Sequence, residues 1–329
     1  MRLLVLGGTA FVGRHIVDAA LEGGHEVTLF NRGQTNPDLF AGVERRHGDR
    51  EASDLASLAS GEWDAVIDVN GYVPRVIREA ADVLKGRVRS YCFISTGSVY
   101  TERADVETDE DSSLGTLEDE TTEEMTNESY GPLKVLCEGE VQRAFPDGAL
   151  IIRPGIVAGP HDHSQRFGYW VRRLARGGPI LGPQRPDQPL QLVHARDQAN
   201  FLVGLLADGI HGVFNCVGPD DPMTFADMIE ACAAAAGTRA DVVWAPDKLL
   251  REHQVALPLS TPASGRWDGV FRRSNERAKK LGFHNRSIAE TAADTFAWED
   301  GRDNSARDAD NLSPEKEAEV LALYAGGKR

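Results

Sequence analysis

The first thirty residues of the chain follow the order strand, turn, helix, strand, and this order constrains the fold more than any other feature. Residues 3–6 form an unbroken apolar run, LLVL, which is typical of a central parallel strand buried on both faces. Gly7 and Gly8 follow directly and permit a tight turn. Apolar residues recur at helical spacing over 11–21, and 26–30 has the pattern of a second strand. The sequence therefore predicts a βαβ unit at this end of the chain.

The glycine turn of this unit indicates a site for a phosphate group. A helix that begins beside such a turn presents free backbone amides and the positive end of its dipole, and both stabilise a pyrophosphate. An ordinary glycine-rich turn is the alternative, because glycine triplets occur in many unrelated turns. The flanking strands and helix favour dinucleotide binding. We expect the cofactor to contact Gly7, Gly8, Thr9, Ala10, Phe11, Val12 and Gly13.

Strand and helix patterns continue to alternate along the chain. Strands are expected at 63–69, 88–96, 149–154 and 212–218, and helices at 73–85, 129–145 and 196–207. This alternation is typical of an α/β fold with a doubly wound parallel sheet of the Rossmann type. The sequence shows no internal repeat.

The alternation breaks over 156–189, a segment rich in glycine, proline and aromatic residues. Ligands of open α/β sheets bind beyond the carboxyl ends of the strands, so such an insertion usually shapes a substrate pocket. We expect a dinucleotide-binding domain over 1–160 plus 190–217, a smaller carboxyl-terminal substrate-binding lobe over 161–189 plus 218–300, and a polar linker with a terminal helix over 301–329. The acidic stretch 105–128 is expected to be a solvated loop.

Charge and cysteine content narrow the class of protein. The chain has 36 Lys and Arg against 51 Asp and Glu, and its net charge of −15 repels nucleic acid and anionic membranes over most of the surface. The four cysteines form no CxxC pair, so we expect reduced thiols and a cytoplasmic protein. No apolar run reaches the length of a signal-peptide core or a membrane span, and we expect a soluble protein.

A second group of residues indicates acid/base chemistry. Tyr130 and Lys134 lie four residues apart in YGPLK, hence on one helix face, and Pro132 is tolerated in the first turn. An ammonium near a phenol lowers the phenol pKa from about 10, so Tyr130 is expected to move a proton near neutral pH. Thr96 ends an apolar strand and can hold the substrate oxygen. Taken alone, the Tyr and Lys pair could be an ordinary helix face.

These motifs together resemble the short-chain dehydrogenase/reductase superfamily, specifically its extended or atypical branch of NAD-dependent epimerase/dehydratase-like proteins. The resemblance continues through IIRPGIVAGP at 151–160, QLVHARDQA at 191–199 and LGF at 281–283. It implies that Thr96 orients the substrate hydroxyl, that Tyr130 is the acid/base, and that Lys134 anchors the cofactor ribose and tunes the tyrosine pKa. It also implies cofactor contacts from Tyr130, Lys134, Pro154, Gly155, Ile156 and Val157.

Two departures from the extended branch bear on function. That branch usually has glycine at the position of Ala10, and GGTAFVG is more similar to an atypical subgroup that includes plastid RNA-binding relatives. Some atypical members have lost active-site residues, whereas this chain retains all three. Dehydratases of the branch carry Asp and Glu directly after the threonine, where this chain has Gly97 and Ser98, so dehydration is disfavoured.

The end of the second strand bears on the choice of cofactor. An NAD-preferring site places Asp or Glu there to bind the ribose 2′-hydroxyl, whereas this chain has Asn31 and Arg32. An arginine can pair with a 2′-phosphate, so NADP is preferred over NAD, and a solvated loop arginine is the alternative. Further cofactor contacts are expected from Asp49, Arg50 and Gly71, although Asp49 could equally be a turn residue.

The segment that follows Gly159 and Pro160 supplies most of the candidate substrate contacts. We expect these contacts from Ser98, His161, His163, Arg166, Tyr169 and Trp170, although the two aromatic residues could equally belong to a core. Two histidines two apart without a third ligand are a weak metal signal, so no metal is expected. Basic residues that could bind a nucleotide sugar are Arg166, Arg172, Arg173, Arg176 and Arg266, with a surface position as the alternative for each. Asp197 is expected to be structural, as a helix cap.

The sequence thus predicts an NAD(P)-dependent epimerase or oxidoreductase that acts at a hydroxyl or ketone carbon of a sugar-like substrate. Epimerisation and reduction share the hydride step, so both remain open. The alternative is a non-catalytic NADP-binding regulator or RNA-binding protein on the same fold. Helices that flank the active-site tyrosine often form dimer interfaces in this superfamily, so a homodimer is a further expectation.

Overall fold

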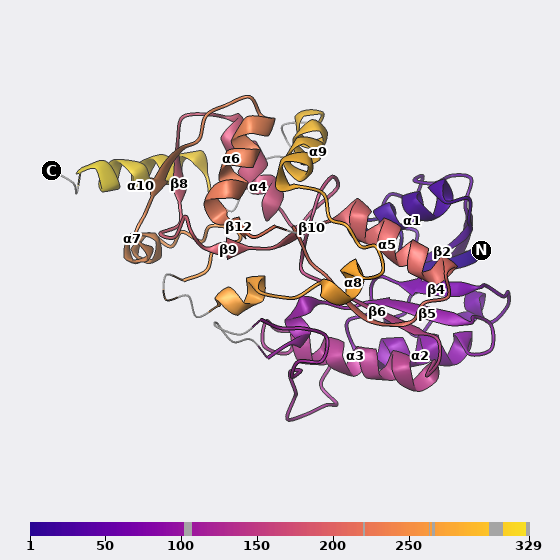
Figure 1. The fold of residues 1–329 in the computed structure, drawn as a ribbon. Coiled ribbons are helices and arrows are strands. Elements are labelled where there is room, and N and C mark those ends of the chain that lie inside the picture. Colours follow the sequence, from indigo (N-terminus) through magenta and orange to yellow (C-terminus); the bar gives the residue numbers. More distant parts are fainter. Residues whose placement is uncertain (102–106, 220, 263, 265–266, 303–311, 327–329) are drawn as a thin grey trace.

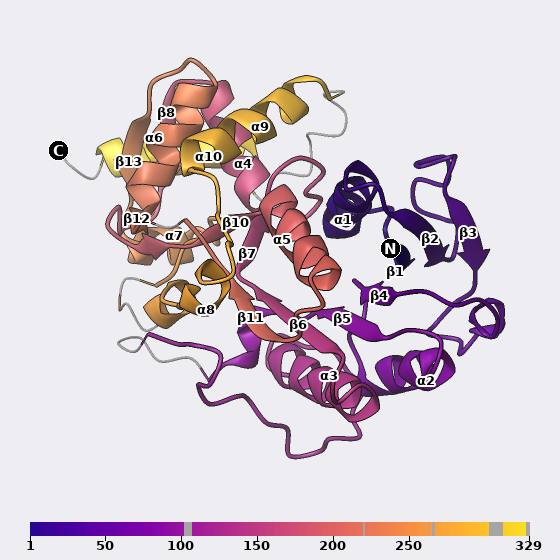
Figure 2. The ribbon, with the colours of Figure 1, turned by 45° about the vertical axis from the view of Figure 1, so that its right-hand side comes forward.

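A seven-stranded parallel sheet forms the centre of the computed structural model, which describes residues 1–101, 107–219, 221–262, 264, 267–302 and 312–326. Its strands are β1 (Arg2–Leu6), β2 (Glu26–Asn31), β3 (Glu44–His47), β4 (Ala65–Asp68), β5 (Ser90–Ile94), β6 (Ala149–Pro154) and β11 (Gly212–Cys216). They lie in the order β11-β6-β5-β4-β1-β2-β3, and every pairing is parallel (Figure 2). The predicted doubly wound α/β sheet is confirmed.

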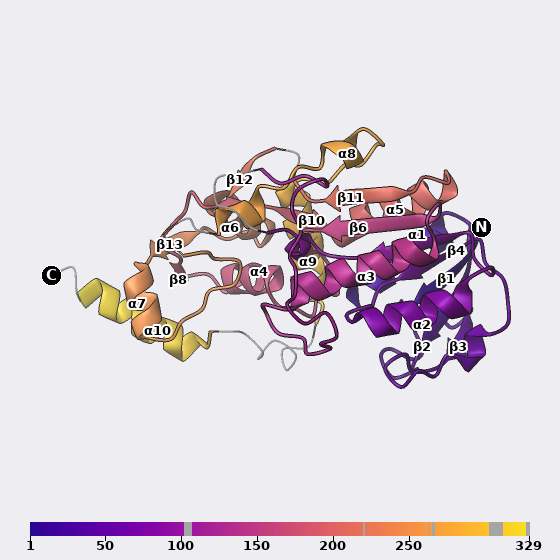
Figure 3. The same cartoon turned by 90° about the horizontal axis from the view of Figure 1, so that it is seen from below.

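Helices cover both faces of this sheet (Figures 1 and 3). Helices α1 (Phe11–Glu22) and α5 (Ala195–Ala207) pack together on one face, and α2 (Pro74–Leu84) and α3 (Tyr130–Ala144) on the other. Successive side chains of a strand point to opposite faces, so Leu3 and Val5 join the core under α1 while Leu4 and Leu6 join the core over α2. All four are buried, which explains why this strand is apolar throughout.

The element bounds differ little from those expected, with one exception. The helices expected at 73–85, 129–145 and 196–207 are found within one residue at each end. The strands expected at 63–69 and 88–96 each begin two residues later than expected and end one or two residues earlier. Strand β3 was not expected, because its sequence ERRH contains no apolar residue. It is the edge strand of the sheet, where charged side chains blunt pairing with other chains.

A second apolar core lies beside the sheet and contains residues of α4 (Phe167–Ala175), α6 (Phe225–Ala235) and α9 (Ile288–Asp300). Its small sheets pair β7 (Ile156–Ala158) with β10 (Leu192–His194), β8 (Pro179–Gly182) with β13 (Asp241–Trp244), and β9 (Pro189–Leu190) with β12 (Met223–Thr224). The remaining short elements are α7 (Asp247–Glu252), α8 (Glu276–Lys279), η1 (Ala56–Leu58), η2 (Gly97–Val99) and η3 (Asp268–Phe271). The expected division into domain and lobe stays a prediction.

Two arginines of α4 form buried ion pairs with the last part of the chain. Arg172 donates to Glu299 of α9 at 2.8 Å, and Arg173 donates to Glu317 of α10 (Pro314–Gly326) at 2.5 Å. Glu317 also accepts from the backbone N–H of Leu181, and it is only 4% exposed. Arg172 and Arg173 therefore hold α9 and α10 in place, and the expectation that they bind a nucleotide sugar is wrong. Of the linker expected at the start of 301–329, residues 303–311 lie outside the described residues.

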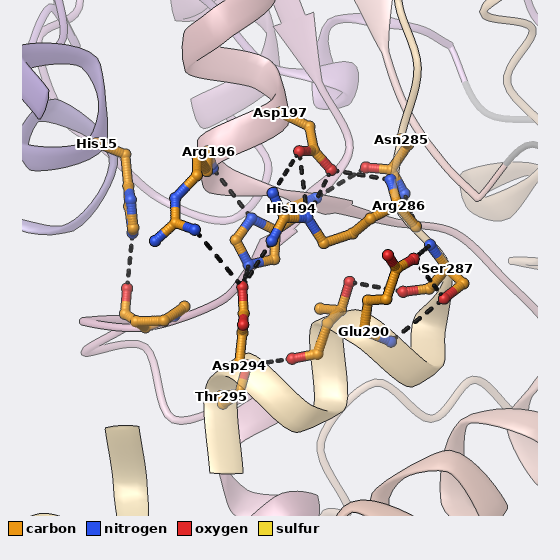
Figure 4. A network of polar contacts seen from close by, with 12 residues as sticks. His15, His194, Arg196, Asp197, Asn285, Arg286, Ser287, Glu290, Asp294 and Thr295 are labelled. Atoms are coloured by element: carbon orange, nitrogen blue, oxygen red, sulfur yellow. Dashed lines mark hydrogen bonds and ion pairs between the residues drawn. The ribbon is translucent and has the colours of Figure 1, made fainter. Parts of the chain in front are cut away.

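A polar network fixes α9 to the amino end of α5 (Figure 4). The cap of α5 is His194, whose Nδ1 accepts from the N–H of Arg196, and not Asp197 as the sequence suggests. Asp197 is structural in a different way, because its carboxylate accepts from Arg286 at 2.7 Å. Arg286 also donates to Asp294 of α9 at 2.6 Å. One guanidinium thus joins two helices.

Within the described part of the chain, no helix is both long and apolar enough to cross a bilayer.

Candidate cofactor and substrate site

A cavity of about 630 Å³ opens at the carboxyl ends of the central strands. Strand β1 lies between β2 and β4, so the chain order reverses at β1, which is where open α/β sheets bind their ligands. The cavity wall includes the turn after β1, the ends of β2 and β4, the end of β5, the start of α3 and the loop before α4. Residues of the second core region, Val270 and Arg273 among them, complete the wall.

The close packing of α1 against the turn after β1 requires glycine at Gly8 in the turn and at Gly13 in the helix. Gly8 has a φ of +93°, and a Cβ there would lie 2.7 Å from the Leu29 side chain. A Cβ on Gly13 would lie 2.7 Å from the backbone nitrogen of Gly8, so the helix can approach the turn this closely only because both residues are glycine. Ala10 has a φ of −110°, which any residue adopts, so alanine at this position causes no backbone strain.

Thr96 and Tyr130 meet at the floor of the cavity. Thr96 caps η2, and its hydroxyl accepts from the N–H of Ser98 at 3.1 Å. The Thr96 side chain acts on the phenol of Tyr130, the first residue of α3, and lowers its pKa. Burial raises the pKa of Tyr130 above its ordinary value, and the Thr96 side chain and the charge of Arg166 offset part of this rise. The resting protein therefore holds Tyr130 as a neutral phenol.

Lys134 lies one helical turn from Tyr130 and is 2% exposed. Its ammonium donates to the carbonyl oxygens of Gly71 and Ile94, both at 2.7 Å, and lies 4.0 Å from the centre of the Phe93 ring. Burial lowers the pKa of Lys134 to about 8. The expectation that Lys134 lowers the tyrosine pKa is not met in this structure, because the influences that lower it come from Thr96 and Arg166.

The end of β2 forms the opposite side of the cavity. Asn31 donates from Nδ2 to the Gly7 carbonyl at 3.3 Å and accepts at Oδ1 from the N–H of Gly33. Arg32 is exposed and lines the cavity, and none of the described residues forms an ion pair with it. Its guanidinium is thus available to an anion that enters this side of the cavity.

Most of the other predicted cofactor residues also line the cavity. They are Gly7, Thr9, Ala10, Phe11, Val12, Asp49, Pro154, Gly155, Ile156 and Val157. Arg50 lines it too, but its guanidinium makes two hydrogen bonds of 2.6 and 2.8 Å to the buried carboxylate of Asp68, so its charge is already compensated. Gly71 does not line the cavity and contributes through its carbonyl oxygen, which holds Lys134.

The predicted substrate residues divide into two groups. Ser98, His163 and Arg166 line the cavity near Tyr130. His161 does not line it and packs against the ring of Trp298, with a pKa that burial and Arg14 lower to about 4.

Two aromatic residues expected at the substrate site lie elsewhere. Tyr169 and Trp170 are fully buried in the second core, and neither lines the cavity. Trp170 packs edge-to-face on Phe225 and donates from Nε1 to the carbonyl of Pro258 at 3.0 Å. Their assignment to the substrate is therefore corrected to a packing role. Arg266, another candidate, lies outside the described residues.

The side chains in the cavity wall that sequence reasoning missed include three with polar groups close to predicted residues. Tyr72 follows Gly71, Asp162 lies between the two predicted histidines, and Arg273 packs against Gly97. Asp162 had a local signal, because it lies in GPHDH between two histidines that were expected to contact the substrate. Arg273 had no local signal, since it reaches the site from a segment more than 170 residues beyond Thr96 in the chain.

These residues fit a bound dinucleotide. Gly8 and Gly13 let the start of α1 pack closely against the turn, and the first residues of this helix line the cavity, where free backbone amides suit a pyrophosphate. Asp162 is 2% exposed and lines the cavity, and its Oδ2 has no hydrogen-bond partner among the described residues, so it can accept from a bound molecule. No group of three or more His, Cys, Asp or Glu in the described ranges is arranged to hold a metal ion.

Comparison with known proteins identifies relatives of the chain. Residues 3–217 match the model of the NAD dependent epimerase/dehydratase family. The chain is 26% identical to the chloroplast stem-loop binding protein of 41 kDa b from Arabidopsis thaliana over 253 residues, which are 72% of this chain and 63% of the plant protein. It is 27% identical to 2′-dehydrokanamycin reductase from Streptomyces kanamyceticus over 281 residues, covering 82% of this chain and 76% of the reductase.

A solved structure with the same fold is UDP-N-acetylglucosamine 4-epimerase from Bacillus cereus. The two structures superpose with a TM-score of 0.68 over 92% of this chain and 100% of the epimerase, at 16% identity. This likeness supports the fold described above.

Proposed function

Since this chain belongs to the NAD-dependent epimerase/dehydratase family, we propose that it is an oxidoreductase or epimerase acting at a hydroxyl or ketone carbon of a sugar-like substrate, with Tyr130 as acid/base. The observation that carries this proposal is the position of Thr96 and Tyr130 in the wall of the cavity that also contains the glycine turn, where the Thr96 hydroxyl lowers the pKa of Tyr130. A protein that only binds a dinucleotide has no need of this pair.

A bound nicotinamide cofactor would supply or accept the hydride. In the reduction direction, the Tyr130 phenol donates its proton to the carbonyl oxygen of the substrate as the hydride arrives at the carbon, so a ketone becomes an alcohol. The Thr96 hydroxyl would hold the same substrate oxygen in line with the phenol of Tyr130. The raised pKa of Tyr130 keeps the phenol protonated, which is the form that a proton donor requires.

Different residues around the cavity can bind different parts of the cofactor. The amides at the start of α1 would hold the pyrophosphate, and the third N–H of Lys134, beyond the two used by carbonyls, would bind the ribose. Arg32 would pair with a 2′-phosphate, which supports NADP over NAD. Asp49 lies in the adjacent wall and would face the adenine side.

Replacing Arg32 with alanine is expected to weaken NADPH binding by about tenfold and to leave NADH binding unchanged, because the variant loses one exposed charge-assisted contact to the 2′-phosphate. Titration of the protein with each reduced cofactor, followed by nicotinamide fluorescence, measures both affinities. Arg45→Ala is the matched control, since Arg45 lies close by in β3 but does not line the cavity. Equal losses for NADPH and NADH would refute the 2′-phosphate role.

The reaction itself can be tested with a panel of ketosugars and nucleotide sugars. A reductase consumes NADPH in proportion to the product formed, whereas an epimerase gives product without net loss of cofactor. Dehydration is not expected, because Gly97 and Ser98 follow Thr96 and neither has the carboxyl group that eliminates water. Absence of turnover across such a panel in a protein that binds the cofactor would favour the non-catalytic alternative.

The similarity to a chloroplast stem-loop binding protein is the one observation that favours a second function, RNA binding. The net charge of −15 opposes this function over most of the surface. A gel-shift titration with stem-loop RNA at physiological salt separates the two possibilities. Binding that NADPH does not affect, together with no turnover of any sugar, would replace the enzymatic proposal.

A homodimer and a cytoplasmic location stay predictions. The outer faces of α2 and α3, which such a dimer would use, carry ion pairs between Arg78 and Glu140 at 3.2 Å and between Arg143 and Asp82 at 3.5 Å. A dimer through these helices would therefore be polar, and its mass in solution would depend on salt.

A further inference from the structure

A second tyrosine, Tyr72, lies in the cavity wall beside Lys134. Its side chain is 41% exposed although most large rings of this chain are buried, and it lines the cavity. The centre of its ring lies 5.4 Å from Lys134 Nζ. Tyr72 directly follows Gly71, the residue whose carbonyl oxygen accepts from that same ammonium.

Two rings and two carbonyl oxygens thus surround the Lys134 ammonium. Phe93 is fully buried and approaches from the sheet, and the carbonyls of Gly71 and Ile94 are fixed parts of the backbone. Neither Phe93 nor Gly71 lines the cavity, whereas Tyr72 does. Tyr72 is therefore a ring in the cavity wall that lies near the ammonium of Lys134, which also lines the cavity.

The backbone leading to Tyr72 is closely fixed. A Cβ on Gly71 would lie 2.0 Å from the Ile77 side chain and 2.8 Å from the Phe93 ring, so only glycine lets the chain pass this near the core. Pro74 then begins α2 and restricts the backbone on the other side of Tyr72. The backbone of Tyr72 is therefore fixed on both sides, and the ring extends from this fixed backbone near Lys134, although the side chain is half exposed.

We propose that Tyr72 is a positioning residue whose ring covers Lys134 on the cavity side, excludes water from the ammonium and keeps it directed at the ribose of a bound nicotinamide cofactor. The covering role depends only on the packing described above. The role toward the ribose rests on the proposed function.

Removing the ring has two opposite effects on Lys134. Loss of the cation–π contact disfavours the ammonium, but 5.4 Å is close to the outer limit of about 6 Å for such contacts, and Phe93 remains at 4.0 Å. Entry of water favours the ammonium, and burial is the main cause of the low pKa of Lys134. The second effect is larger, so the pKa rises. The other groups that influence Lys134 are Cys137, Asp68, Glu138 and Arg50, with Tyr130 one turn away, and all remain in place.

The test is a pH titration of the lysine side chains by NMR in protein labelled with ¹³C at lysine Cε. The chain has seven lysines, and a Lys134→Met variant assigns the signal. The midpoint for Lys134 is expected near pH 8 in the unchanged protein and in Tyr72→Phe, which keeps the ring. In Tyr72→Ala it is expected about one pH unit higher. A matched control is Tyr324→Ala on α10, at the far end of the molecule (Figure 1).

An unchanged midpoint in Tyr72→Ala would overturn the covering role, as would an equal shift in Tyr72→Phe, which would assign the effect to the hydroxyl. NADPH binding tests the role toward the ribose. Tyr72→Ala is expected to bind NADPH about tenfold more weakly than the unchanged protein, and Tyr72→Phe is expected to bind it equally well. A shifted midpoint with unchanged NADPH affinity would remove the ribose role. If the unchanged protein binds neither NADPH nor NADH, the proposed function fails, while the lysine titration still decides whether Tyr72 covers Lys134.

Discussion

Replacing Tyr130 with phenylalanine is expected to lower kcat by about 10²- to 10⁴-fold on any substrate that the unchanged protein turns over, because the substrate oxygen loses its proton donor. The ring stays, so the packing at the start of α3 and the affinity for NADPH should change little. Steady-state kinetics measure the first effect, and fluorescence titration with NADPH measures the second.

A matched control is Tyr324→Phe, which removes a hydroxyl on α10 away from the cavity. A Tyr130→Phe protein with unchanged kcat would show that another group moves the proton, and the proposed role of Tyr130 would be wrong. A Thr96→Val variant adds a gradation. It keeps the phenol but removes the hydroxyl that acts on it, so its kcat should fall between those of the unchanged protein and Tyr130→Phe.

Replacing Glu138 with alanine is expected to lower the free energy of unfolding by about 3–5 kcal/mol, because the Arg153 guanidinium is left buried without its partner. Arg153 and Glu138 are 3% and 2% exposed, and Arg153 Nη2 donates to Glu138 Oε2 at 2.6 Å. Glu138 also accepts from the hydroxyl of Ser95, directly before Thr96. Urea unfolding followed by circular dichroism measures the loss.

The control is Glu140→Ala, two residues further along α3, whose ion pairs with Arg78 and Arg143 lie on the surface. Its expected cost is within about 1 kcal/mol. A double variant with methionine at both Glu138 and Arg153 should recover part of the loss, since neither buried charge remains. If Glu138→Ala unfolds at the same urea concentration as the unchanged protein, the buried pair contributes nothing to stability.

The sheet could be predicted because its central strands are buried on both faces. Leu3, Leu4, Val5 and Leu6 are all apolar for that reason, and the turn that follows them has a local signature. Strand β3 could not be predicted, because a charged edge strand is held by its neighbour's backbone and by little of its own sequence.

The candidate site was predictable where its residues belong to short local motifs, as Thr96, Tyr130 and Lys134 do. Tyr169 and Trp170 were assigned to the substrate because the sequence alone does not distinguish an aromatic residue of a core from one that lines a pocket. Only the packing of α4 against α6 shows that both belong to the core. The pKa of Tyr130 could not be foreseen either, since it depends on burial and not on the spacing to Lys134.

The ion pair between Arg173 and Glu317 has a consequence for work with shortened forms of the protein. Cutting the chain before α10 would remove the carboxylate and leave a guanidinium that is 6% exposed without a counter-charge inside the second core. Such a fragment would keep the glycine turn and every cavity residue named above, and yet would be prone to misfold or aggregate. Expression tags and protease sites are therefore better placed after α10 than before it.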